Sequence, residues 1–186
     1  MEKIESFKGQ YSFLSNLYDS PFNYRYTIGT KGEDIDKVKR LQEELYDIIF
    51  IEDKKLPEIF LKCKTVEHGF CALKSEYFID VVNILDSDAP NEAKRKSENT
   101  SSVPSWEFIK EAFMYDLVRE KFSQNPKLLD KLIQTEGKKL IHGNWWKDFY
   151  WGVDSITGEG KNRLGEILMR FRTNFLLFHT RKREQV

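Results

Sequence analysis

Apolar residues recur at regular spacing in the middle of the chain. They stand three or four positions apart, which is the spacing of one face of an α-helix. Thr65 precedes the run and is a suitable N-cap, because its hydroxyl can accept a hydrogen bond from a first-turn amide. The pattern predicts a buried helix that begins after Thr65. Its apolar positions are Val66, Phe70, Leu73, Tyr77 and Val81.

Other helices and strands follow from the same criteria. Helical spacing or start signals predict helices over residues 91–96, within an otherwise polar linker at 86–104, and over 105–122, 125–137 and 163–178. Alternating apolar residues predict a strand over residues 22–26, after a turn at Leu14-Ser15-Asn16, and residues 139–142 form a short strand candidate. Most of the predicted elements are helices.

Residues 29–61 differ in composition from the flanking sequence. Lys, Glu and Asp dominate, and apolar residues at helical spacing run from Ile35 to Ile48. Residues 46–51 and 58–61 also match two strands of a hairpin, and the helix and strand predictions conflict over 46–49. We favour a helix to about Leu45 with strands after it.

The composition indicates one globular domain over residues 1–186, with 40% hydrophobic residues. The 30 Lys and Arg balance the 30 Asp and Glu, so no global field favours nucleic acid or a membrane. Cys63, Cys71 and the three His lack a metal-ligand spacing, and no segment is apolar enough to span a bilayer. We expect a cytoplasmic protein with reduced thiols and no metal or cofactor.

Candidate chemistry lies on a second stripe of the helix after Thr65. Glu67, Cys71 and Lys74 stand at i, i+4 and i+7, so they share one face. A carboxylate and an amine beside an apolar face can reach a cleft wall, where burial and mutual charge would tune their proton affinities. The alternative is an ordinary pair of solvent-facing charges on a helix.

Two loops near the C-terminal helix also invite a functional interpretation. Residues 143–152 hold three Trp, a Phe and a Tyr around Asp148, and their irregular pattern predicts a loop whose aromatics pack on the core or bind a ligand. Residues 157–162 form a glycine-rich turn before the last helix, where backbone amides could bind a phosphate. Capping of that helix by Asn162 is the alternative.

Taken together, these segments resemble the YbiA-like, or NADAR, family of N-glycosidases. The matches keep the family order and cover almost the whole chain except residues 29–61, which resemble an insertion. The matching residues are 11–16 (YSFLSN), 20–22 (SPF), 65–68 (TVEH), Phe70, Ala72, Lys74, Trp106, Met114, 121–122 (KF), Thr135, Asp148, 151–152 (WG), 160–165 (GKNRLG), 168–169 (LM) and Arg172.

The resemblance implies a YbiA-like fold that is mainly α with a small β component (α+β), and hydrolysis of an N-glycosidic bond. Family members act on phosphorylated intermediates of riboflavin synthesis or on ADP-ribose attached to guanine in nucleic acid. The implied partner is therefore a phosphoribosyl or ADP-ribosyl substrate, either a small molecule or one carried by a nucleic acid that is contacted transiently. The neutral net charge argues against tight duplex binding, but a single flipped or single-stranded nucleotide remains compatible with it.

The resemblance also implies roles for individual residues. Glu67 would stabilise the cationic transition state or activate water, Asp148 would assist it or bind the ribose, and Trp151 would stack on the base. Lys74 would depress the pKa of Glu67 or attack an opened sugar as an amine nucleophile. The implied substrate-binding residues are Ser15, Asn16, Phe22, Trp106, Trp151, Gly152, Asn162 and Arg172.

Three positions depart from the family pattern. Leu17 replaces an aromatic residue, and Cys71 replaces a glutamine. His142 stands where an acidic residue is usual, and it is either a substrate contact or acid, or a packed His with one backbone hydrogen bond.

Two other functions remain open. A binding module would hold ADP-ribose or a nucleotide without cleaving it, although the joint presence of Glu67, Lys74, Asp148 and Trp151 favours turnover. A protein-interaction domain would use the apolar stripe of residues 29–61.

Overall fold

The computed structural model describes residues 2–27 and 58–183. The chain forms two compact units, which are described separately. The terminal unit combines residues 1–18 with 114–186, and the middle unit holds residues 19–113. The boundary falls within helix α5 (Trp106–Gln124), which contributes its first turns to the middle unit and the rest to the terminal unit.

The middle unit opens with a two-stranded antiparallel ladder of β2 (Phe22–Thr27) and β3 (Glu58–Cys63). Phe22 and Tyr24 are buried while Asn23 is exposed, as the alternating pattern predicts. The predicted strand over residues 58–61 is confirmed as part of β3, and it pairs with β2. Its predicted hairpin partner at 46–51 and the predicted helix up to Leu45 lie outside the described residues, as does most of the proposed insertion.

Helix α2 (Val66–Lys74) begins where predicted, because the Thr65 hydroxyl accepts a hydrogen bond from the His68 amide at 3.2 Å. It is shorter than the apolar spacing indicates. Ser75 is extended and forms a β-bridge with Ser102, and a separate helix α3 (Phe78–Leu85) follows. The prediction of one helix through Val81 is therefore wrong, and Tyr77 at its break is 50% exposed.

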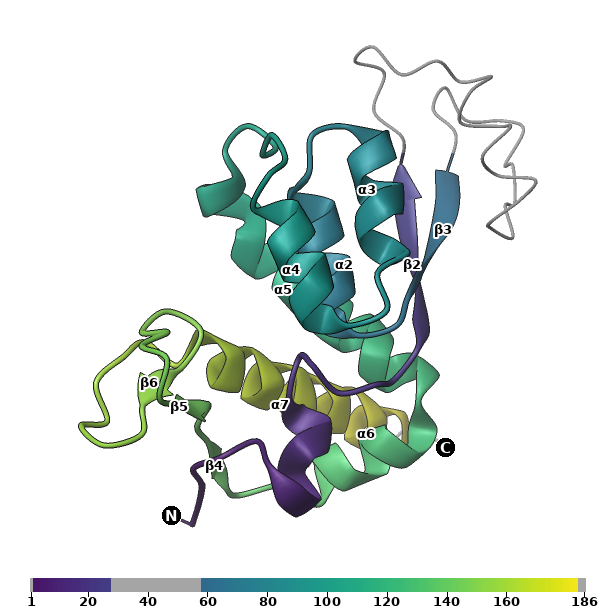
Figure 1. Cartoon of the computed structure of the whole chain (residues 1–186). Coiled ribbons are helices and arrows are strands. Elements are labelled where there is room, and N and C mark those ends of the chain that lie inside the picture. The colour runs from purple at the N-terminus through teal and green to yellow at the C-terminus, as the bar shows by residue number, and fades with distance from the viewer. Residues whose placement is uncertain (1, 28–57, 184–186) are drawn as a thin grey trace. The chain divides into compact units, whose positions relative to one another are not determined.

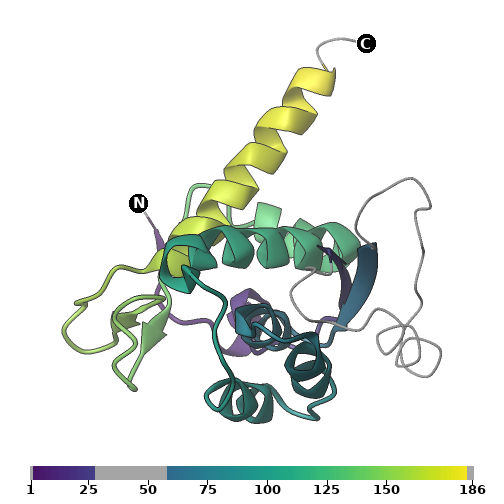
Figure 2. The ribbon, with the colours of Figure 1, turned by 90° about the horizontal axis from the view of Figure 1, so that it is seen from above.

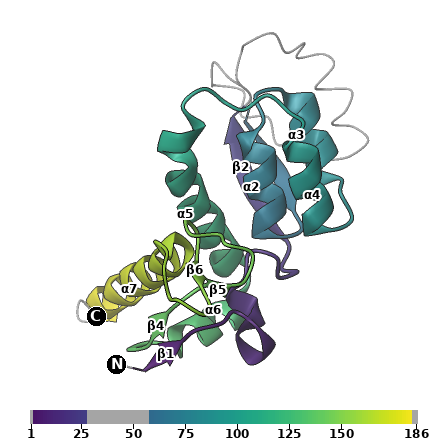
Figure 3. The ribbon, with the colours of Figure 1, turned by 60° about the vertical axis from the view of Figure 1, so that its left-hand side comes forward.

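Helix α4 (Pro90–Ser97) confirms the short helix predicted over residues 91–96. The surrounding segment is better packed than a linker, since Ala93 and Ser97 are buried and the Lys96 amine donates to the Asn83 carbonyl of α3 at 2.9 Å. Figure 3 shows α2, α3 and α4 grouped beside β2 in the middle unit.

The helices of the terminal unit are α6 (Pro126–Ile133), α7 (Arg163–Arg183) and the greater part of α5 (Figure 1). Pro126 stands at the first position of α6, as predicted. Helix α7 is a single long helix (Figure 2), and its buried apolar face ends before Phe178, which is 57% exposed. The fully buried residues of this unit include Leu117, Phe122, Leu132, Leu140, Leu164 and Leu168.

Short β-ladders complete the terminal unit. β1 (Lys3–Ile4) pairs in parallel with β4 (Lys139–Leu140), and β5 (Gly143–Asn144) pairs in parallel with β6 (Val153–Asp154). A 3-10 helix, η1 (Gly9–Leu14), precedes the predicted turn at Ser15 and Asn16. The helices together with these small ladders confirm the α+β class, while a single domain over 1–186 stays a prediction.

Lys121 is an unexpected member of the terminal core. Its side chain is 1% exposed, and its Nζ donates to the carbonyl oxygens of Phe13 at 2.8 Å and Ser15 at 2.9 Å. Burial lowers the pKa of the Lys121 amine to about 7, because the charged form loses its hydration. The cost of burying this charge is therefore linked to pH.

Replacing Lys121 with Met should flatten the pH dependence of stability. In the wild type the unfolded amine titrates near 10.5 and the folded amine near 7. The unfolded state binds more protons between these values, so the free energy of unfolding rises with pH across that window. Below pH 7 both states are protonated and the burial penalty is at its full size.

Urea unfolding at about pH 6, 8 and 9.5 measures this slope. Lys131→Met is the matched control, since Lys131 is exposed and its Nζ lies 5.8 Å from the centre of the Phe13 ring. The control should keep the wild-type slope. An undiminished slope in Lys121→Met would contradict the lowered pKa.

Candidate functional site

Glu67 and Lys74 lie on one face of α2, and both side chains are half-buried. Cys71 stands between them and is buried, and its thiol donates weakly to Glu67 Oε1 at 3.9 Å. Burial, reinforced by the Glu67 charge and opposed by Lys74, raises the pKa of Cys71 to about 12. Both charges therefore act on the same thiol, which supports the predicted stripe over the solvent-facing alternative.

The Cys71 thiol supplies a donor at this position. Because its pKa lies far above neutrality, the sulfur keeps its proton and can donate to the Glu67 carboxylate. A glutamine amide at this position, as the family resemblance implies, would also be a donor. The departure thus replaces one donor by a smaller and weaker one.

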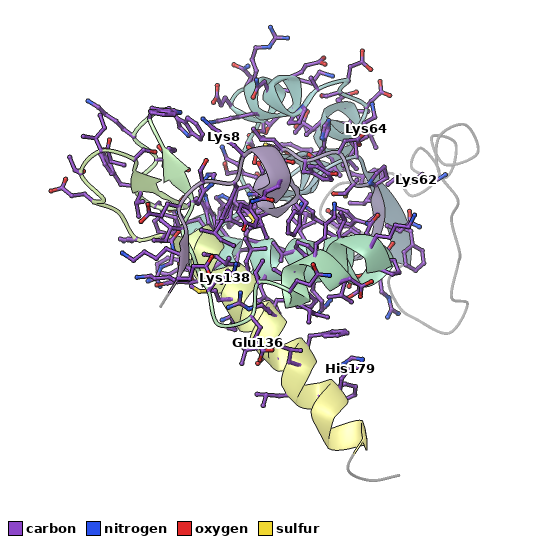
Figure 4. The ribbon with its side chains drawn as sticks, turned by 90° about the horizontal axis from the view of Figure 1, so that it is seen from below. Lys8, Lys62, Lys64, Glu136, Lys138 and His179 are labelled. Carbon is purple, nitrogen blue, oxygen red and sulfur yellow. The ribbon has the colours of Figure 1, made fainter. Side chains whose placement is uncertain are left out.

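His68 anchors the N-terminal end of α2. Its Nδ1 lies 2.9 Å from Thr65 Oγ1, and its Nε2 lies 3.1 Å from the Ser87 carbonyl oxygen. Burial lowers the pKa of His68, so the ring is neutral at pH 7. The Lys64 amine, labelled in Figure 4, donates to the same Ser87 carbonyl at 2.7 Å. These contacts fix the turn of helix that carries Glu67.

The aromatic loop, residues 143–152 of the terminal unit, is organised by the side chain of Asn144. This amide is fully buried; its Oδ1 accepts from the Asp148 amide at 2.9 Å, and its Nδ2 donates to the carbonyls of Asp148 and Val153. Asp148 Oδ1 then accepts from the amides of Tyr150 at 3.1 Å and Trp151 at 2.9 Å. Asp148 and Trp151, two predicted site residues, are thus held together.

Asn162 closes the loop from its other end. Its Oδ1 accepts from the His142 amide, and its Nδ2 donates to the Leu140 carbonyl, both at 2.8 Å. Its φ of 53° lies in the left-handed region that asparagine tolerates better than most residues. Gly152 packs closely against the backbone of His142, since a Cβ there would overlap the His142 carbonyl oxygen. Both ends of the Asn162 amide are therefore engaged by backbone.

The start of α7 does not offer the predicted phosphate site. The amides of Lys161, Asn162, Arg163 and Leu164 donate to the carbonyls of Phe149, Gly152, Tyr150 and Trp151, respectively. These amides are occupied by the aromatic loop, and the Asn162 side chain is directed to the β4 end instead of capping the helix. Neither of the two expectations for the turn at 157–162 holds.

Several aromatic residues of the loop face solvent. Trp145 is 66% exposed, Trp146 55% and Phe149 43%, whereas Tyr150 and Trp151 are half-buried. Core packing therefore fails as an explanation for the first three. The Lys8 amine, labelled in Figure 4, lies 4.5 Å from the centre of the Trp145 ring, which gives this indole a cation–π contact.

The first residues of the chain run alongside the segment that leads into the loop. The amides of Lys139 and Ile141 donate to the carbonyls of Glu2 and Ile4 at 2.9 and 2.8 Å. The rings of Phe7 and His142 follow, with centroids 5.2 Å apart. Residues 2–8 therefore pack along residues 139–145 in the terminal unit.

His142 packs between Phe7 and Trp146. Its ring contacts Phe7 and Trp146, and its buried Nδ1 has no hydrogen-bond partner within the described part of the chain. Burial lowers the pKa of His142, and Asp148 opposes the shift. The ring is therefore neutral at pH 7, which argues against the acid role. The packing agrees with the second alternative, but the expected hydrogen bond from a backbone group to the ring is not seen at Nδ1 among the described residues, and the His142 amide donates to Asn162 Oδ1.

Ser15 and Asn16 follow η1 and are half-buried. Ser15 Oγ accepts from the Leu17 amide at 3.2 Å, and Asn16 Nδ2 donates to the Met114 sulfur at 3.5 Å. The turn is thus attached to α5 through Asn16 Nδ2. The other polar atom of this side chain is the amide oxygen Oδ1. Their role in substrate binding stays a prediction.

The other predicted substrate-binding residues take core positions. Phe22 is 4% exposed in β2, and Trp106 is 7% exposed and packs against Phe70 and Phe113 in the middle unit. Arg172 is buried in the terminal unit, where its guanidinium donates to Thr135 Oγ1 at 2.6 Å and to the Lys138 carbonyl at 3.1 Å. These contacts stabilise the turn after α6, and a substrate contact by Arg172 stays a prediction.

The described residues contain neither a metal-binding cluster nor a helix that could span a membrane. In residues 2–27 and 58–183, no group of three or more His, Cys, Asp and Glu side chains is placed to hold a metal ion. Over the same ranges, the structure contains no helix with the length and apolar character that a membrane span requires.

Comparison with known proteins identifies the family. The family model for the NADAR domain matches residues 5–176. The chain belongs to the NADAR domain family. The N-glycosidase YbiA of Shigella boydii serotype 4 (strain Sb227) is 38% identical to this NADAR protein over 112 residues, covering 58% of this chain and 68% of the relative. This relative confirms the predicted enzyme class, a hydrolase acting on N-glycosyl bonds.

Two further similarities extend the comparison. The NMR structure of the Escherichia coli protein YbiA has a TM-score of 0.66 and 25% identity, covering 97% of this NADAR chain and 89% of that chain. The chloroplastic riboflavin biosynthesis protein PYRR of Zea mays is 32% identical over 127 residues, covering 60% of this chain and 20% of the relative. The sequence and the fold thus agree on the family.

Substitutions at Asn162 should separate its hydrogen bonds from its backbone geometry. Asn162→Gly keeps the left-handed backbone accessible but removes both hydrogen bonds, so the free energy of unfolding should fall by about 1–3 kcal/mol. Asn162→Ala should cost about 1 kcal/mol more, because alanine is strained at this φ. Urea unfolding measures both values. Equal stability of the two variants would contradict the role of the left-handed backbone.

Proposed function

We propose that this NADAR-family protein hydrolyses the N-glycosidic bond between a phosphorylated ribose, or ADP-ribose, and a nitrogen base. The observation that carries the proposal is the pair of half-buried charged groups, Glu67 and Lys74, on one face of the capped helix α2. Relatives named N-glycosidase YbiA support the reaction type. The substrate class is the finer part of the proposal.

The reaction needs groups that match the charge development. As the bond between ribose C1′ and nitrogen breaks, its electron pair leaves with the nitrogen and the ribose gains oxocarbenium character. A carboxylate stabilises that cation or takes a proton from the attacking water, whose oxygen joins C1′, and the base leaves protonated. We assign the carboxylate to Glu67, whose α2 turn is fixed by Thr65 and His68.

Lys74 has two chemically different roles within this proposal. Its ammonium can act as a fixed positive charge that keeps Glu67 ionised. As a free amine it can instead attack C1′ of an opened ribose, which is then held to the base as an imine; the bond to Lys74 forms as the base nitrogen takes up a proton and leaves. Water then returns the free sugar and the amine, so the two roles differ in whether a covalent adduct forms.

Asp148 and Trp151 are proposed to bind the substrate. Asp148 uses Oδ1 to orient the Tyr150 and Trp151 amides, so its carboxylate is held in one direction for the ribose hydroxyls. Trp151 is half-buried, and its indole is proposed to stack on the base. Ser15 and Asn16 supply short polar groups on a fixed turn, which suit contacts to the sugar or phosphate.

Different observations favour the two substrate classes. The PYRR name of the Zea mays relative supports a phosphoribosyl intermediate of riboflavin synthesis. The exposed indoles of Trp145 and Trp146, with the Lys8 amine beside Trp145, support an ADP-ribosylated guanine carried on a single strand, because aromatic faces stack on neighbouring bases. Both classes share the phosphorylated ribose bound to nitrogen, which is the core of the proposal.

Glu67→Gln should abolish base release while leaving the fold intact. The amide preserves the shape of the side chain but can neither accept a proton nor balance a cation, so kcat should fall by about 100-fold or more. The assay incubates the protein separately with riboflavin intermediates and with ADP-ribosylated guanine in single-stranded DNA, and identifies the released product by mass.

Glu76→Gln is the matched control for this measurement, because Glu76 is an exposed carboxylate just beyond α2. It should keep wild-type turnover. Retained turnover in Glu67→Gln would rule out the assigned role, and tight binding without turnover by the wild type would indicate a binding module for ADP-ribose or nucleotides instead of an enzyme.

Borohydride trapping should distinguish the two roles of Lys74. If the amine forms an imine, cyanoborohydride added during turnover will reduce it to a stable secondary amine, and tryptic mass spectrometry will find the sugar on Lys74. Lys74→Arg keeps the positive charge but cannot form this adduct. Substantial turnover in Lys74→Arg, together with an untrapped wild type, would assign Lys74 to the electrostatic role.

A further inference from the structure

The turn that carries Ser15 and Asn16 is attached to α5 at two points. Asn16 Nδ2 donates to the sulfur of Met114, and the carbonyls of Phe13 and Ser15 accept from Lys121 Nζ. Met114 and Lys121 are seven positions apart, so they share one face of the helix, and each is 1% exposed. Two residues of α5, two helical turns apart, therefore bind residues 13–16, and all of these residues belong to the terminal unit.

Burying the Lys121 side chain costs free energy. Lysine is almost never fully buried unless it is paired, since its ammonium loses hydration in the interior. No carboxylate is within ion-pair distance of Lys121 in the described ranges of the chain, and its surroundings are the two carbonyls and the ring faces of Tyr18 and Phe122 at 5.5 and 5.3 Å. An apolar side chain of similar length would fill this volume without the desolvation cost.

We propose that Lys121 is a positioning residue for the reaction: by binding the Phe13 and Ser15 carbonyls, it holds Ser15 and Asn16 where they contact the substrate. This inference rests on the proposed function, because it takes from it the substrate contacts of Ser15 and Asn16. The Lys121 amine itself does not touch the substrate.

The geometry explains why two hydrogen bonds are needed. The Ser15 carbonyl also accepts from the Tyr18 amide at 3.3 Å, and the Ser15 amide donates to the Ser12 carbonyl at 2.9 Å. These local bonds close the turn but leave its attachment to the helix undefined. Lys121 Nζ binds the carbonyls on both sides of Leu14, and together with the Asn16–Met114 contact it attaches the turn to α5 at two helix positions.

The test compares steady-state kinetics of Lys121→Met and Lys131→Met on the substrate that the wild type cleaves. Lys121→Met should raise KM about tenfold with kcat nearly unchanged, because loosening the turn weakens binding of substrate and transition state alike. Lys131→Met removes an exposed lysine over the same Phe13 ring and should leave both constants unchanged. A fall in kcat at constant KM would overturn the inference.

A double-mutant cycle with Asn16→Ala shows whether Lys121 acts through the turn. If it does, the KM increases of Lys121→Met and Asn16→Ala will not multiply in the double variant, since the second change removes a contact already lost. Fully multiplicative increases would overturn the inference. Lys121→Gln retains one amide donor and should show an intermediate KM, which keeps the test open if Lys121→Met does not fold.

Hydrogen exchange separates this inference from the proposed function. In Lys121→Met, or in Lys121→Gln where the first variant is unfolded, the amides of Ser15 and Tyr18 should exchange faster, while Lys131→Met should match the wild type. Absence of N-glycosidase activity in the wild type would refute the proposed function alone. Unchanged exchange at both amides would refute the positioning role, whatever the activity.

Discussion

Two buried asparagine side chains carry the geometry of the aromatic loop. Between β4 and α7 the chain has little regular secondary structure, so its backbone groups need other partners. Asn144 makes three hydrogen bonds, to the backbone of Asp148 and Val153, and Asn162 makes two, to the backbone of Leu140 and His142 just before the loop. Asp148 and Trp151 take their orientation from this scaffold. An interior hydrogen bond matters here because its loss leaves a buried donor or acceptor unsatisfied.

The sequence predicts local structure well where the signal is local. The N-cap at Thr65, the alternation in β2 and Pro126 at the start of α6 each depend on neighbouring residues alone, and each is confirmed. Apolar spacing does not predict the break after α2, because Ser75 leaves the helix to pair with Ser102, which is distant in sequence. Apolar spacing continues through such a break, so periodicity cannot reveal it.

The predicted site shows the same division. The shared face of Glu67 and Lys74 follows from helical geometry, and the structure reproduces it. The family resemblance marks Arg172 and Asn162 as substrate contacts, which stay predictions, and the structure adds that their polar groups bind backbone carbonyls and an amide distant in sequence. A sequence motif can contain residues that bind substrate and residues that stabilise the fold, and it does not distinguish the two. Lys121 is among the residues that match the family, but its burial is not predicted, because a lysine on a helix is normally exposed to solvent.

The packing of residues 2–8 links the first strand to the aromatic loop. Strand β1 hydrogen-bonds to β4, Phe7 packs on His142, and the Lys8 amine contacts the Trp145 ring. Residues 2–8 therefore support the aromatic loop. A substitution in residues 2–8 can therefore disturb Asp148 and Trp151 without altering either residue, because the effect passes through the backbone that leads into the loop.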